Sequence, residues 1–262
     1  MTLFDTESQY REKATIWRML SELPLYASLA EGRMWRWFAV NMPMDLVPTG
    51  AFTGDIDLLA RLNDYPRSRR EIYKAWEVKV SLLTKEGRVR SLKARKTERT
   101  MNQLRAYRRF GSPDVSLLDV FLCESGFFHV SGAGFDRKQY PPSLDRSLTT
   151  KIRVLGEEGF GYKIMPFGHG KDGDVDVGLL AVGAGGLPGR VGLTMLDPVE
   201  SEIRDPFSSW VQRIEKFAVE SGDRRSRHTQ MVFCRDCRQL HWICMRDEDS
   251  CPGCGGDLIA QS

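Results

Sequence analysis

The chain has 262 residues, of which 41% are hydrophobic and 28% charged, and its net charge is +3. That length and composition are typical of a globular protein with room for one large domain and one small one. No apolar run approaches the roughly 20 residues that a membrane-spanning helix needs. Residues 1–12 are polar and carry three acids. We therefore expect no membrane partner, no secretory signal and a cytoplasmic location.

Cysteines and basic residues are both unevenly placed along the chain. Cys123 stands alone, and the other five of the six cysteines lie between Cys234 and Cys254. In a chain without export signals, such crowding favours metal ligation over disulfide bonds. Residues 85–109 hold ten Lys or Arg against two Glu. A block of this kind fits either the phosphates of a nucleic acid or a solvated helix face.

Helices are expected before residue 50. Residues 7–22 and 28–40 space apolar side chains at helical intervals, and prolines follow both segments. Residues 44–47 are expected as a short strand. Glu31 lies on the second helix, where it either joins a functional site or is an exposed helical glutamate.

Two strands are expected next, at residues 52–62 and 71–83, because acidic and aliphatic residues alternate at 54–59 and charged and apolar residues alternate at 75–80. Glu77 and Lys79 must share a face of the second strand. Asp55 and Asp57 likewise share a face of the first strand, so if the strands pair, a carboxylate of the first lies beside Glu77 and Lys79 of the second. Two carboxylates can hold a divalent cation, and a neighbouring lysine can orient or activate a water molecule. The alternative is that these are charges on the solvent face of an ordinary hairpin.

A long basic helix is expected at residues 89–110, followed by a buried strand at 115–123. Gln103 and Tyr107 are four residues apart and therefore lie on one face of the helix. A strand, a helix and a second strand in this order favour a parallel pairing of the two strands.

This order of elements, with its motifs, resembles the PD-(D/E)xK nuclease superfamily, particularly its RecB-like branch. Residues 54–57 (Gly-Asp-Ile-Asp) resemble the family's glycine-x-isoleucine-aspartate element, and residues 77–79 (Glu-Val-Lys) resemble its acid-x-lysine element. Residues 103–107 resemble the Gln-x-x-x-Tyr signature of the branch. The resemblance spans residues 7–125.

The resemblance implies a site for Mg²⁺ or Mn²⁺ that cleaves DNA, with RNA left open as a substrate. The residues expected to function there are Asp57, Glu77, Lys79, Gln103 and Tyr107, with Asp57, Glu77 and the Val78 carbonyl as the metal ligands. Lys79 would position the attacking water, and Gln103, Tyr107 and the basic block would hold the nucleic-acid backbone. The implied products carry 5′-phosphate and 3′-hydroxyl ends. Whether Glu31 or Asp55 joins the site stays open.

Residues 126–198 are rich in glycine and are expected to be β-structure, with a hairpin turn at 171–174. The sequence does not indicate what this region does. Residues 199–221 are expected to be largely helical, because their apolar side chains form one stripe. Residues 223–228 form a short basic linker.

The last part of the chain resembles a zinc ribbon. Cys234, Cys237, Cys251 and Cys254 form two Cys-x-x-Cys knuckles, with 13 residues between the second and third cysteine. Four thiolates at this spacing fit a tetrahedral, structural zinc site. His241 and Cys244 lie between the knuckles and could substitute as ligands. The ribbon would contact DNA, dock a protein partner or only cap the fold.

We therefore expect an α/β protein built on a restriction-endonuclease-like αβββαβ core. The expected domains are the nuclease core (1–125), a β-rich extension (126–198), a helix with a basic linker (199–228) and the zinc ribbon (229–262). The expected function is that of a Mg²⁺-dependent deoxyribonuclease in DNA repair, restriction or anti-phage defence. The alternatives are a non-catalytic nucleic-acid-binding module on a nuclease-like scaffold and a zinc-ribbon adaptor.

Overall fold

The computed structural model describes residues 29, 33–46, 52–63, 71–83, 88–91, 97–123, 142–169, 175–176, 193–222, 229–244 and 250–258. The described elements, in chain order, are β1 (Met34–Pro43), η1 (Met44–Leu46), β2 (Asp55–Asn63), β3 (Glu71–Leu83), β4 (Val89–Ser91), α3 (Thr97–Arg109), β5 (Asp114–Cys123), α4 (Pro142–Glu157), β6 (Gly161–His169), β7 (Val175–Asp176), β8 (Leu193–Leu196), α6 (Phe207–Glu220), β9 (Thr229–Cys234) and β10 (Gln239–Cys244).

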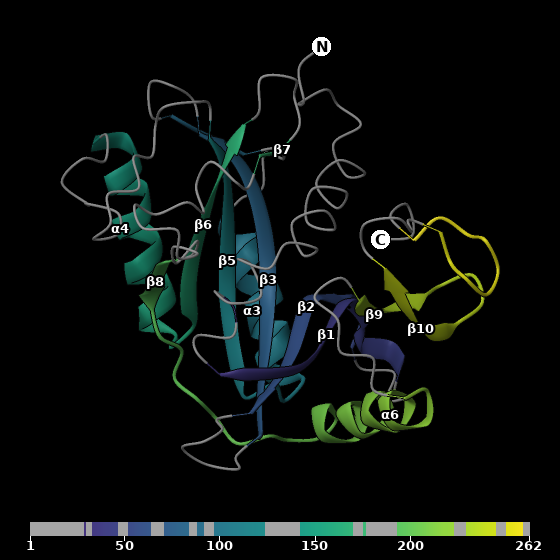
Figure 1. The fold of residues 1–262 in the computed structure, drawn as a ribbon. Coiled ribbons are helices and arrows are strands. Elements are labelled where there is room, and N and C mark those ends of the chain that lie inside the picture. Colours follow the sequence, from purple (N-terminus) through teal and green to yellow (C-terminus); the bar gives the residue numbers. More distant parts are fainter. Residues whose placement is uncertain are drawn as a thin grey trace.

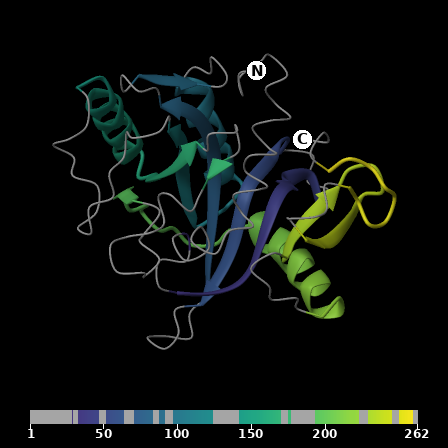
Figure 2. The same cartoon turned by 45° about the horizontal axis from the view of Figure 1, so that its top comes forward.

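One mixed sheet organises the described part of the chain. Its strands run in the order β10-β9-β1-β2-β3-β5-β6-β7, while β4 pairs with β3 and β8 with β6. β2 pairs antiparallel with both β1 and β3, whereas β5 pairs parallel with both β3 and β6. Figures 1 and 2 both place α4 at one side of the sheet and the β9–β10 hairpin at the other. The mixed α/β class expected from the sequence is confirmed.

The two faces of the sheet have different covers. Residues of α3, α4 and α6 form one hydrophobic cluster with the first face, and among them are Leu104, Leu148 and Trp210. The cluster on the second face includes Cys251 and Leu258, which come from the segment after β10. The cysteine-rich segment is therefore part of the protein core.

Helix α6 connects the sheet centre to its β9–β10 edge. The indole N–H of Trp210 donates a hydrogen bond to the Pro43 carbonyl at the end of β1, at 2.9 Å. The indole N–H of Trp242 in β10 donates to the Ser221 hydroxyl just after the helix, at 2.8 Å. These contacts hold the hairpin against the rest of the fold.

The helix expected at residues 28–40 is wrong beyond its start, because β1 occupies Met34–Pro43. Trp37 and Phe38 are both buried, yet they belong to hydrophobic clusters on opposite faces of the sheet. A strand covered on both faces reads as a continuous apolar run, which periodicity alone does not separate from a buried helix. Likewise, the strand expected at 44–47 is a 3-10 turn at Met44–Leu46.

Two further expectations need correction. The single basic helix at 89–110 is instead the short strand β4, paired to β3, and the helix α3, which begins at Thr97. Residues 126–198 are not all β-structure, because α4 lies at Pro142–Glu157. The buried side chains of Leu144, Leu148 and Leu155 follow helical spacing there.

The remaining expectations are confirmed, are shifted in their bounds or fall outside the described residues. The strand at 71–83 is confirmed, as is its parallel pairing with the strand that follows the helix. Helix α6 begins at Phe207, later than the expected 199. Pro206 disfavours a helical backbone at the residue directly before it, Asp205. The helix expected at 7–22, Glu31, the turn at 171–174 and the linker at 223–228 lie outside the described residues.

Candidate functional site

Asp57 and Glu77 lie where β2 and β3 begin to part. The antiparallel ladder ends with the pair Leu58 and Trp76, so Asp57 and Glu77 come next on the two strands. The backbone N–H of Val78 donates a hydrogen bond to Oδ2 of Asp57 at 2.9 Å. The preceding Gly54 has a φ of 104°, a backbone conformation that favours glycine and that starts β2 at this place.

The Glu77 carboxylate is fully buried and makes two contacts with functional candidates. Its Oε1 accepts a hydrogen bond from the Lys79 ammonium, which forms an ion pair with it. Its Oε2 lies 2.5 Å from the Tyr107 hydroxyl. Burial and the charge of Asp57 raise the pKa of Glu77 to about 7, although Lys79 and Tyr107 lower it. The site therefore holds a buried carboxylate that readily takes up a cation or a proton.

Tyr107 links this carboxylate to the start of β2. Its hydroxyl lies 2.8 Å from the Asp55 carbonyl oxygen and accepts a hydrogen bond from the Asp57 N–H at 3.3 Å. Burial, followed by the charges of Glu77 and Asp57, raises the pKa of Tyr107 well above its usual value. Tyr107 is therefore a neutral hydrogen-bonding group that fixes the two acidic residues relative to α3.

Gln103 lies one turn before Tyr107 on α3, as expected. Its Oε1 is buried and has no hydrogen-bond partner within the described ranges. The structure thus brings Asp57, Glu77, Lys79 and Tyr107 into one network and places Gln103 on the adjoining turn. The roles expected for these residues and for the Val78 carbonyl stay predictions.

A second buried carboxylate, Asp119 of β5, was missed by the sequence reasoning. It pairs in register with Lys79 on the neighbouring strand and is almost completely buried. Its Oδ2 accepts hydrogen bonds from the Lys151 ammonium of α4 and from the Tyr162 hydroxyl, the latter at 2.7 Å. An acid in the middle of an apolar strand was the signal, since a buried charge needs a partner.

Lys151→Met should lower the free energy of unfolding by about 2 kcal/mol, because it removes a charged hydrogen bond from the buried Asp119. Chemical denaturation at neutral pH measures this loss. Arg153→Met is the matched control, since its ion pair with Glu157 lies on the exposed side of the same helix and should contribute less than about 0.5 kcal/mol. Equal losses in the two variants would contradict the role given to the buried pair.

Glu77 should make the protein less stable as the pH rises from about 4.5 to about 7 in magnesium-free buffer. Its folded-state pKa is raised, so the folded protein keeps a proton that the unfolded chain has already released. The contribution of Glu77 to the free energy of unfolding is complete below pH 4.5 and is lost toward pH 7. The free energy of unfolding should fall with a slope approaching ~1.4 kcal/mol per pH unit. Denaturation at several pH values should show this slope, and Glu77→Gln should remove it. The same slope in both proteins would refute the prediction.

The four expected zinc ligands form one cluster. The sulfur atoms of Cys234, Cys237, Cys251 and Cys254 all lie within 4.8 Å of one another. Two of the separations are 3.6 and 3.7 Å, close to the edge of about 3.8 Å that four Zn–S bonds of 2.3 Å give a tetrahedron. The cluster can therefore hold a metal ion such as zinc.

The backbone around the cluster is shaped for sulfur ligands. The N–H of Gly253 donates to the Cys251 sulfur at 3.3 Å, and Gly255 adopts a φ of 75°. Burial, followed by the hydrogen bond with the Cys234 sulfur, raises the pKa of Cys237 to about 12. Metal binding must therefore displace protons from these thiols.

The two possible substitute ligands differ in position. His241 Nε2 lies 3.2 Å from the Cys237 sulfur, so this ring borders the cluster. Burial lowers the pKa of His241, which favours a neutral ring. Cys244 is not among the clustered cysteines.

Part of the basic block is engaged within the protein. Arg105 forms an ion pair with Glu158 after α4. Arg108 donates to the carbonyl groups of Glu158 and Gly159, and it stacks 4.0 Å from the Phe160 ring centre. These two arginines attach α3 to the turn before β6. Fewer basic residues of the block at 85–109 are therefore left to face a nucleic acid.

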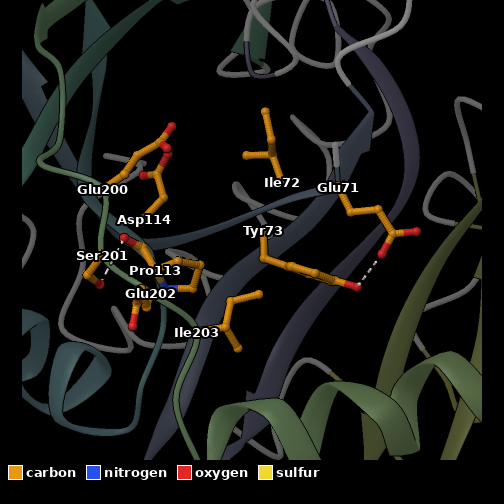
Figure 3. Close-up of a pocket in the computed structure, with 9 residues that line it drawn as sticks. All are labelled: Glu71, Ile72, Tyr73, Pro113, Asp114, Glu200, Ser201, Glu202 and Ile203. Atoms are coloured by element: carbon orange, nitrogen blue, oxygen red, sulfur yellow. Dashed lines mark hydrogen bonds between the residues drawn. The ribbon is translucent and has the colours of Figure 1, made fainter. Parts of the chain in front are cut away.

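A pocket of about 470 Å³ opens at the N-terminal ends of β3 and β5 (Figure 3). Figure 3 shows the carboxylates of Asp114 and Glu200 at one side and Glu71 beyond the Tyr73 ring. Glu202 also lines it. Because its charged lining is acidic, this pocket does not suit phosphate groups.

Comparisons with protein-family models, with curated proteins and with solved structures found no match. Among the described helices, none has the length and apolar character needed to cross a membrane.

Proposed function

We propose that this protein is a metal-dependent deoxyribonuclease with a PD-(D/E)xK-like core. The observation that carries the proposal is that Asp57, Glu77 and Lys79 lie together where β2 and β3 separate. Tyr107 is hydrogen-bonded to the Glu77 carboxylate. The order β1-β2-β3-β4-α3-β5, in which the short β4 pairs with β3 and β3 is parallel to β5, also agrees with the βββαβ part of that core.

The residues present fit a divalent cation. Glu77 is a buried carboxylate with a raised pKa beside a second carboxylate, so a cation there relieves the repulsion between them. Asp57, Glu77 and the Val78 carbonyl would hold Mg²⁺ or Mn²⁺. When bound, the ion would polarise the scissile phosphate and lower the pKa of the attacking water.

The other side chains at the site would have separate roles. Lys79, released from Glu77 when a cation takes its place, would orient the attacking water or offset the charge that develops on the phosphate. Tyr107 would keep the Glu77 carboxylate and the β2 backbone at a fixed separation. Gln103 would hold the nucleic-acid backbone near the site. Such backbone contacts carry little sequence information.

We also propose zinc as the ion of the four-cysteine cluster. The sulfur separations match tetrahedral thiolate geometry. Four protein ligands leave no open position, so this ion would stabilise the fold and take no part in hydrolysis.

The direct test is an assay of the purified protein on single-stranded, duplex and supercoiled DNA and on RNA, with Mg²⁺, Mn²⁺ or neither. We expect metal-dependent cleavage of DNA into products with 5′-phosphate and 3′-hydroxyl ends, which a ligase can rejoin. Salt-dependent DNA binding without any metal-dependent cleavage would overturn the proposal. That result would favour a non-catalytic nucleic-acid-binding protein.

A further inference from the structure

Arg235 connects the cysteine cluster to the candidate nuclease site. It lies between the first two cysteines of the cluster, and its guanidinium forms an ion pair with Oδ2 of Asp55. Asp55 is the first residue of β2, and its carbonyl oxygen lies 2.8 Å from the Tyr107 hydroxyl that contacts Glu77. A short series of contacts thus joins the first knuckle to the buried carboxylate.

The strand register explains why Arg235 reaches this place. β9 runs parallel to β1, with Val232 beside Val40, so Arg235 lies level with Pro43 if the register continues. Pro43 in turn pairs with Asp55 across the antiparallel β1–β2 ladder. The first knuckle therefore lies at the edge of the sheet where β2 begins and where Asp57 meets Glu77.

The two partners of this ion pair are unequally exposed. The Arg235 side chain is 48% exposed, whereas that of Asp55 is 16% exposed. The guanidinium therefore remains accessible from solvent while the carboxylate lies beneath it. An ion pair with one exposed partner is weaker than a fully buried one. An incoming anion can therefore reach the guanidinium and compete with the carboxylate for it.

We propose that the first knuckle forms one wall of the nucleic-acid-binding site and that Arg235 contacts a phosphate of the bound strand. The inference rests on the proposed function, because it assumes that a strand enters beside Asp57 and Glu77. Asp55 holds the guanidinium in the free protein, and the phosphate takes its place on binding. The planar guanidinium suits phosphate because it can donate two parallel hydrogen bonds.

The test measures binding of a fluorescently labelled DNA to the zinc-loaded protein by anisotropy, over a range of salt and without added magnesium. Arg235→Ala should weaken binding about tenfold and reduce the salt slope by about one. Arg235→Lys should keep the slope, because it keeps the charge. Asp55→Asn should bind at least as tightly as the unchanged protein, since it removes the competing carboxylate.

Arg238→Ala is the matched control, because Arg238 is an exposed arginine that follows the same knuckle. It should bind DNA like the unchanged protein, and all variants should keep their zinc content. The inference is overturned if the Arg235→Ala and Arg238→Ala proteins bind alike. It is also overturned if Asp55→Asn and Arg235→Ala weaken binding equally, as expected of a pair that only positions the knuckle.

The two proposals fail in different ways. If the unchanged protein does not cut DNA with magnesium, the proposed function fails. If it cuts DNA but the Arg235 variants show no specific loss of binding, only the role of the knuckle fails.

Discussion

Glu77→Gln should lose metal-dependent DNA cleavage by about 10³-fold or more, because a neutral amide replaces a carboxylate that would contribute several kcal/mol through the metal. The substitution keeps the volume of the side chain and can keep a hydrogen bond to Tyr107. It also removes a buried group whose charged form is disfavoured, so the variant should unfold at the same denaturant concentration or higher at pH 8. Initial cleavage rates and denaturation curves measure the two effects.

Glu71→Gln is the matched control for that experiment. Glu71 is an exposed carboxylate at the start of the same strand, paired with Arg61. Its cleavage rate should stay within about twofold of the unchanged protein. Lys79→Met should lose cleavage like Glu77→Gln, since its ammonium serves the same site. Cleavage retained in both the Glu77 and Lys79 variants would remove the assignment of the active site.

Cys251→Ser should lose the bound zinc and lower the free energy of unfolding by about 4 kcal/mol or more, since structural zinc contributes directly to folding. Cys251 is buried in the hydrophobic cluster on the second face of the sheet, so the effect should spread beyond the knuckle. Metal analysis of the purified protein gives the zinc content, and thermal or chemical unfolding gives the stability.

Cys244→Ser provides the comparison, because Cys244 lies on the same hairpin but outside the four-sulfur group. It should keep one zinc per chain and lose little stability. Full zinc content and unchanged unfolding in the Cys251→Ser protein would show that the cluster does not bind the metal as proposed.

The sequence was most informative where alternation and spacing were strict. Residues 77–80 alternate charged and apolar side chains, and the strand expected around them forms β3 within the expected bounds. Face-sharing rules placed Glu77 and Lys79 together and predicted an aspartate of the preceding strand beside them. The resemblance to the nuclease superfamily then selected Asp57 and Tyr107 for the same site. The cysteine spacing likewise led to the four clustered sulfurs.

The sequence was least informative where a strand is covered on both faces or where contacting residues lie far apart in the sequence. β1 is covered on both faces by segments far along the chain, so its apolar run resembled a helix. Asp119 acquires its partners from α4 and β6, more than 30 residues later, as the Lys151 contact shows. Arg235 and Asp55 are separated by 180 residues, and the parallel β9–β1 pairing helps to bring them together.

That pairing also bears on how the chain folds during synthesis. β1 is made early, yet the partner for one of its edges is β9, so this edge exposes unpaired N–H and C=O groups until residues 229–234 have emerged. Contacts between such distant segments slow folding and leave a partly folded chain open to edge-to-edge association. A nascent chain stalled before the first knuckle should therefore self-associate or recruit chaperones, and zinc uptake should coincide with closure of the sheet.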